Sequence, residues 1–119
     1  MSQLVAETLY IREFELEIAL RCGERREYEY EFDGVTPKAE VEVGQGDYEE
    51  EWKGDTALAE VLALFARLAI RSDSNPLEIA GRALRVLGIQ WEQVKSLELE
   101  IAYSDGRAHE FEYEGKEQD

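Results

Sequence analysis

Glutamates at every second position are the side chains in this sequence best placed to do chemistry. Glu15 and Glu17 alternate with apolar residues in one segment, and Glu98 and Glu100 do so in another. Alternate residues of a strand point to the same face, so these carboxylates are expected to gather on one surface. Such a surface suggests acid–base catalysis, cation binding or attraction of a basic partner.

Catalysis and a dedicated metal site are the less favoured of these uses. Paired carboxylates act as acid and base when burial or a specific partner separates their pKa values, and a sheet face open to water supplies neither. Mutual repulsion should raise several of the pKa values modestly. A calcium site takes about six to eight oxygens, usually from an Asp-rich loop, and residues 44–47 do not match one. We therefore expect no enzyme activity, no catalytic residue, no cofactor and no metal site, but weak association with cations.

The single histidine and the single cysteine favour structural interpretations. His109 lies on the inward phase of a predicted strand, and no second His or Cys exists to share a metal with it. Cys22 falls in a predicted exposed turn with acidic surroundings, which argue against a reactive thiolate. One cysteine also excludes an internal disulfide.

The glutamates belong to a segment that occurs twice. Residues 14–31 read FELEIALRCGERREYEYE and residues 97–114 read LELEIAYSDGRAHEFEYE, aligned at an offset of 83 without a gap. Each copy has two alternating runs around a turn, at Gly23 and at Gly106, which is typical of a β-hairpin. The sequence therefore predicts one hairpin used twice in one sheet, with Leu16 and Leu99 buried at equivalent places.

Two helices are predicted between the copies. Residues 57–71 carry apolar side chains at helical spacing, and Asp55 or Thr56 can cap their start. A second helix is expected over 76–87, because Asn75 precedes a proline at its start and a glycine follows its end.

Two extended segments complete the pattern: a strand over 38–43 and a weaker one over 47–53, with a connector at 91–94 that can form one 3₁₀ turn. The expected order is three strands, a weaker fourth, two helices and two further strands. This order indicates a single α+β domain, folded over roughly 8–115. Its sheet should have six strands, be largely antiparallel and carry both helices on one face.

The aromatic residues fall into two groups, one expected in the core and one that could contact a ligand. The inward phase holds six that we expect in the core: Tyr28, Tyr30, Phe32, Tyr103, Phe111 and Tyr113. An apolar ligand contact, if there is one, is expected at Tyr48, Trp52 or Trp91.

Charge is distributed unevenly between the two predicted faces. The chain has 119 residues and a formal net charge of −15, and its outward strand phase carries most of the glutamates. Nucleic acid and anionic membranes are therefore disfavoured as partners, whereas a basic protein or peptide is favoured.

No apolar run is long enough for a transmembrane segment, and a monomer is favoured. The candidate acidic interaction face comprises Glu15, Glu17, Glu29, Glu31, Glu98, Glu100, Glu112 and Glu114.

The chain resembles a known family in the order of its elements and in its paired hairpins. The motifs are ELEIAYSDGRAHEFEYE near the end, IREFELEIAL and GERREYEYE near the start, and KAEVEV between them. Over roughly residues 11–114 the sequence is similar to the YusW-like family of small bacterial proteins. The resemblance implies a cell-envelope location, because such proteins are typically secreted lipoproteins of Gram-positive bacteria. It implies no particular activity and carries no functional residue onto this chain.

One departure from the family pattern leaves the location open. Members carry a signal and a lipidated cysteine before the domain, and the segment ahead of residue 11 shows neither. We expect an envelope protein whose signal has been removed, with a cytosolic protein as the alternative.

The expected function is a non-enzymatic interaction or accessory domain. Two alternatives remain: a cytosolic acidic mimic of nucleic acid that blocks a DNA-binding protein, and an envelope protein that binds cations weakly. The acidic face can also be a solvated surface that confers solubility and prevents edge-to-edge aggregation.

Overall fold

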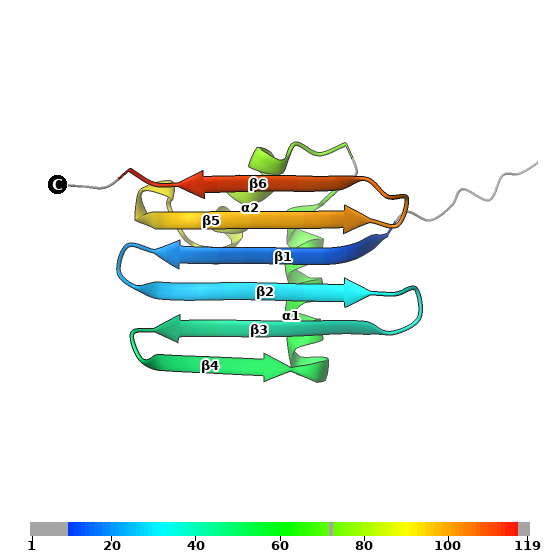
Figure 1. The fold of residues 1–119 in the computed structure, drawn as a ribbon, viewed down its shortest axis with the longest axis horizontal. Helices are drawn as coiled ribbons and strands as arrows, with labels where there is room; N and C mark the ends of the chain where they lie inside the picture. Colours follow the sequence, from blue (N-terminus) through cyan, green and yellow to red (C-terminus); the bar gives the residue numbers. More distant parts are fainter. Residues whose placement is uncertain (1–9, 72, 117–119) are drawn as a thin grey trace, which may run out of the picture.

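The computed structural model describes residues 10–71 and 73–116. They form a six-stranded antiparallel sheet with two α-helices packed on one face (Figure 1). The predicted α+β fold is therefore confirmed; the start of the predicted folded part, residues 8 and 9, lies outside the described residues. The strands lie in the order β4-β3-β2-β1-β5-β6. The element bounds are β1 Ile11–Leu20, β2 Glu24–Phe32, β3 Pro37–Gln45, β4 Tyr48–Lys53, α1 Gly54–Leu68, α2 Pro76–Leu87, η1 Trp91–Gln93, β5 Val94–Tyr103 and β6 Ala108–Glu114.

The repeated segment forms two equivalent hairpins, as predicted. Gly23 in the β1–β2 turn has φ 99° and Gly106 in the β5–β6 turn has φ 93°, values that glycine adopts without strain. β1 and β5 are neighbours inside the sheet, and Leu16 pairs directly with its own repeat equivalent, Leu99. A local two-fold axis perpendicular to the sheet therefore passes between these leucines and relates the hairpin β1–β2 to the hairpin β5–β6.

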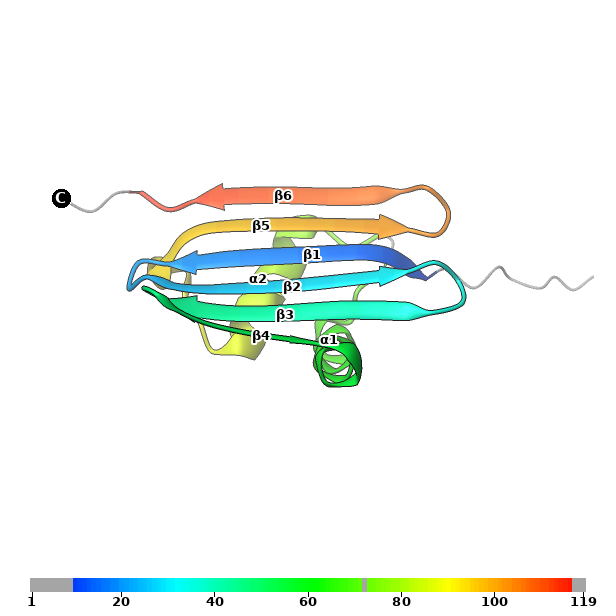
Figure 2. The same ribbon diagram turned by 60° about the horizontal axis from the view of Figure 1, so that its bottom comes forward.

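The hydrophobic core lies between the sheet and the helices (Figure 2). Leu16 and Leu99 are 0% and 1% exposed, and no polar side chain within residues 10–71 and 73–116 is fully buried. α1 packs across β2, β3 and β4, whereas α2 contacts β6. Of the predicted core aromatics, the structure buries two fully and the others partly: Tyr28 and Tyr103 are buried, and Tyr30, Phe32, Phe111 and Tyr113 are half-buried.

The first helix begins and ends earlier than the sequence suggested. α1 starts at Gly54 with Lys53 at the N-cap position, and no side chain caps it, so the predicted cap at Asp55 or Thr56 is wrong. The physical reason is that β4 continues straight into the helix through Gly54 at φ 69°, which places Asp55 inside the first turn. There its carboxylate still interacts favourably with the helix dipole.

The C-terminus of α1 is set by a left-handed residue and by an arginine from the second helix. Ala69 has φ 49°, and its N–H bonds the Phe65 carbonyl at 3.2 Å. Arg82 Nη1 donates to the Leu68 carbonyl at 2.8 Å, which satisfies another terminal acceptor. The helix therefore stops at Leu68 and does not reach residue 71.

The second helix has the predicted start and end. The Asn75 side-chain oxygen accepts a hydrogen bond from the Leu77 N–H at 2.9 Å, and Pro76 occupies the first helical position. Gly88 ends the helix at φ 74°. The predicted 3₁₀ turn follows as η1.

Candidate functional site: an acidic face

The strand register aligns the glutamates in two rows across the outer face, by which we mean the face of the sheet opposite the helices. The all-glutamate row takes one residue from every strand of the described sheet, from β4 to β6: Glu51, Glu42, Glu27, Glu17, Glu98 and Glu112. The lysine-ended row lies beside it: Lys53, Glu40, Glu29, Glu15, Glu100 and Glu110. Because adjacent strands are about 4.8 Å apart, neighbouring carboxylates within a row are held close together.

Most of the predicted acidic interaction face lies in these rows. Two predicted members lie at the margin: Glu31 pairs with Glu13 and Lys38, and Glu114 pairs with Ser96. The predicted face does not include Glu27 and Glu42, although the register places both in the all-glutamate row. Alternation within a strand tells which face of the sheet a side chain lies on. Which side chains line up in one row also depends on the register between neighbouring strands.

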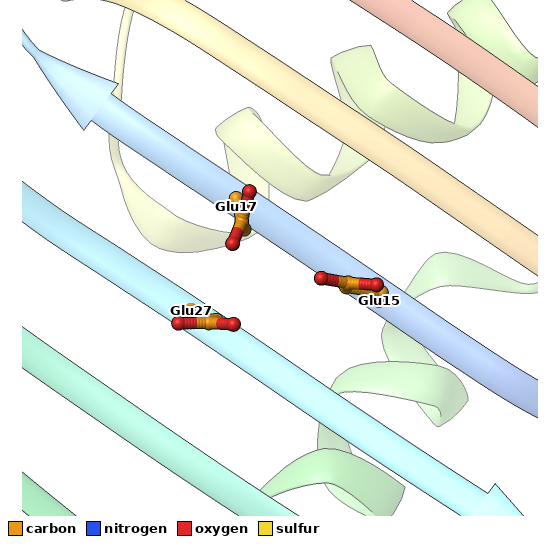
Figure 3. Close-up of side chains that lie close together, drawn as sticks. All are labelled: Glu15, Glu17 and Glu27. Carbon is orange, nitrogen blue, oxygen red and sulfur yellow. The ribbon is translucent and has the colours of Figure 1, made fainter.

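The carboxylates are closest together near the centre of the sheet. Glu15, Glu17 and Glu27 each place a carboxylate oxygen within 4.8 Å of the others (Figure 3). All three side chains are half-buried, although they lie on the uncovered face, because neighbouring stems shield one another. Three oxygens from separate residues are fewer than a calcium ion requires, so the cluster favours loose association with a cation.

This crowding raises the affinity of the carboxylates for protons. Burial, hydrogen bonds with Glu29 and Glu42, and repulsion from Glu17 raise the pKa of Glu27 to about 8. A hydrogen bond with Glu98, together with burial, raises the pKa of Glu17. The predicted direction agrees, but the effect at Glu27 is larger than the modest one expected, because desolvation adds to repulsion. Near neutral pH Glu27 therefore keeps its proton most of the time, and the all-glutamate row carries less than its formal charge.

Counter-charge is supplied at one end of the rows. Lys53 Nζ lies 3.1 Å from Glu40 Oε1 and 3.1 Å from Glu51 Oε1, and its hydrogen bond lowers the pKa of Glu40. At the β6 end, Glu110 and Glu112 are exposed, and no ion pair to either is found among the described residues. The rows thus have a basic end at β4 and an acidic end at β6.

The two arginines that flank the β1–β2 turn have different roles. Arg21 Nε donates to the Glu92 carbonyl at 3.1 Å and its guanidinium also contacts the Lys116 carbonyl, so it ties the turn to η1 and to the C-terminal segment. Arg25 lies on the outer face between Ala19 and Gly44, where its guanidinium crosses above the glycine.

Shallow hollows flank the rows. One, of about 710 Å³, includes the small residues Ala19, Gly44 and Ser96. The other, of about 580 Å³, includes Ala102 and Ala108. The all-glutamate row lines the first hollow, and the lysine-ended row lines the second. A ligand in either hollow would therefore meet carboxylates.

The other residues singled out from the sequence lie apart from these rows. His109 is half-buried on the helix-covered phase, with its ring 5.2 Å from that of Tyr103. Cys22 is exposed in the β1–β2 turn. Tyr48 is exposed, whereas Trp52 and Trp91 pack against the core and contact Glu60 and Tyr113, respectively.

Comparison with known proteins identifies the family. The family model of YusW-like proteins matches residues 12–105, from β1 to the β5–β6 turn, so this chain belongs to the YusW-like family. Comparisons with curated proteins and with solved structures gave no match. Within the described part of the chain, neither helix has the length and apolar character needed to cross a bilayer.

Proposed function

We propose that this protein is a non-enzymatic interaction or accessory module of the bacterial cell envelope, and that its outer face binds a cationic segment of a partner protein. The observation that carries the proposal is the alignment of the glutamates in two adjacent rows across the sheet. The envelope location follows from the resemblance described above and is part of the proposal.

The energetic cost of this arrangement supports a binding role. Like charges directly opposite each other across strands are destabilising. Glutamate is also a poor strand former, and lysine or threonine at some of these positions would relieve the repulsion. A cationic partner would remove the cost by supplying counter-charge, and the field of the face would accelerate its encounter.

Weak cation association is a second candidate, favoured by the close approach of Glu15, Glu17 and Glu27. Each carboxylate can give one oxygen to a shared ion, with water completing the shell. We expect such binding to be weak and non-selective among divalent ions, since no described loop adds backbone carbonyls to the cluster.

The test is binding of a lysine-rich peptide, measured by isothermal titration calorimetry at low and high salt. In the outer-face variant, Glu17, Glu29, Glu100 and Glu112 are changed to Gln. A control variant removes the same charge elsewhere, with Asp47→Asn, Glu50→Gln, Asp73→Asn and Glu78→Gln.

We expect the wild type and the control to bind and to lose affinity with salt, whereas the outer-face variant binds at least tenfold more weakly. Equal binding by the two variants would show that net charge alone attracts the peptide. If the wild type does not bind the peptide at low salt, the proposal is wrong and the acidic face is only a solvated surface.

A further inference from the structure

The free edge of β6 presents the backbone groups of its own glutamates. Tyr103 N–H donates to the Arg107 carbonyl at 2.8 Å, and Gly115 N–H donates to the Lys95 carbonyl at 2.8 Å. In an antiparallel ladder every second residue of a strand bonds to the same neighbouring strand. The residues of β6 that bond to β5 are therefore the inward ones, His109, Phe111 and Tyr113, which lie between Arg107 and Gly115. The amides of Glu110, Glu112 and Glu114 therefore point away from the sheet, where a further strand would pair.

The internal two-fold axis relates the free edge of β6 to the outer side of β2, where another strand is already paired. The axis relates β6 to β2, and the outer side of β2 is paired with β3. Glu110, Glu112 and Glu114 correspond to Glu27, Glu29 and Glu31, which face Glu42, Glu40 and Lys38 of β3. The half of the sheet ending at β6 thus lacks the strand that β3 supplies to the other half.

Charge and shape define what would fit there. Both glutamate rows end at β6 without the lysine that closes one of them at β4. Lysine or arginine at the outward positions of an added strand would close the rows in the same way. At its inward positions, the strand would repeat the small and β-branched residues of β3, namely Ala39, Val41 and Val43.

The second helix extends beside the free edge of β6. In the view onto the sheet, the first turn of α2 projects past β6 (Figure 1). This turn carries Leu77, which is 51% exposed. The part of the helix layer nearest the free edge of β6 therefore includes an apolar residue that is open to water.

We propose that the β6 edge captures an extended segment of a partner protein in which basic and small apolar residues alternate, and that this segment adds as a seventh, antiparallel strand. The proposal rests on the proposed function and specifies the partner and its position. The β4 edge is less suitable, because Lys53 already closes it and the chain passes directly into α1. A second copy of this chain is disfavoured, since β6 against β6 would oppose glutamates to glutamates.

The probe is a capped peptide in which lysine alternates with valine, compared with a lysine–valine peptide of equal composition in which the residues do not alternate. Two variants separate backbone pairing from charge. Glu112→Pro removes the charge and the edge N–H but leaves the ladder to β5 intact, because proline is tolerated on an edge strand. Glu112→Gln removes the charge alone.

We expect the alternating peptide to bind the wild type at least tenfold more tightly than the non-alternating one, and Glu112→Pro to bind it at least tenfold more weakly than Glu112→Gln. Hydrogen exchange on the wild type gives a readout without a variant: the amides of Glu110 and Glu112 should become protected on binding. Equal binding of both peptides with no amide protection would contradict the addition of a seventh strand but would still agree with a cationic partner. If neither peptide binds, the proposed function itself fails. Dimerisation of the protein without peptide would show a second copy at this edge and overturn the proposal.

Discussion

Acidification should stabilise this protein over an interval in which many proteins change little. Burial, together with hydrogen bonds and repulsion from neighbouring glutamates, raises the pKa of the Glu27 carboxyl from 4.5 to about 8. Because the folded state holds this proton more tightly than the unfolded state does, the stabilisation is complete below about pH 4.5 and is lost as the pH rises through about 8.

The magnitude follows from the size of the pKa change. A rise from 4.5 to about 8 is equivalent to about 5 kcal/mol at about 1.4 kcal/mol per pH unit. Glu27 is half-buried and its neighbours face water, so solvent and salt screen much of this energy, and we expect about 1–2 kcal/mol. For a domain of this size that corresponds to a melting temperature about 4–10 °C higher at about pH 5.5 than at about pH 8.

The assay is thermal unfolding followed by circular dichroism at the two pH values. Asp33 and Asp105 do not confound it, because backbone hydrogen bonds lower the pKa of each carboxyl and keep it ionised over this interval. Glu27→Gln should melt higher than the wild type at about pH 8 and should lose most of the pH dependence. The control Glu78→Gln, an equal charge change on α2, should keep it. A wild-type melting temperature that falls on acidification, or an unchanged slope in Glu27→Gln, would refute the reasoning.

Further outcomes concern salt, the core and two glycines. The melting temperature should rise between about 0.01 and 0.15 M NaCl, because the Debye length falls from about 30 to 8 Å; a flat response would mean that the glutamates are neutralised within the fold. Leu16→Ala should lower the free energy of unfolding by about 2–5 kcal/mol in urea denaturation. Gly81→Ala, inside α2 with open space around the new Cβ, should raise it by about 0.5–1 kcal/mol. Gly115→Ala should lower it by about 1–3 kcal/mol, because the Cβ would meet the Val94 carbonyl and the Arg21 guanidinium; equal melting of the two alanine variants would contradict that packing.

Local patterns predicted much of the fold. The alternation in residues 14–31 and 97–114 gave both hairpins, and Asn75 and Gly88 gave the ends of α2, because each feature depends on a few neighbouring residues. The start of α1 was missed because Gly54 at positive φ carries β4 directly into the helix, where a capping side chain at residue 55 or 56 had been expected.

The acidic face was predicted as a side of the sheet, but its arrangement in rows was not. The phase of each strand follows from alternation within that strand. Register between distant strands is a tertiary property, and the direct pairing of Leu16 with Leu99 aligns the glutamates of the two repeats. The β1–β2 hairpin places Glu27 opposite Glu17, and the separate pairing of β2 with β3 places it opposite Glu42, so its crowding depends on two registers at once.

The central claim is that the outer face is a crowded carboxylate surface that a cationic segment neutralises. NMR titration of the Glu27 carboxyl carbon, without and with a saturating lysine-rich peptide, tests it most directly. We predict a pKa of about 8 for the free protein and a clearly lower pKa in the complex, because bound positive charge favours the ionised carboxylate. A pKa near 4.5 in the free protein, or one that the peptide leaves unchanged, would contradict the account.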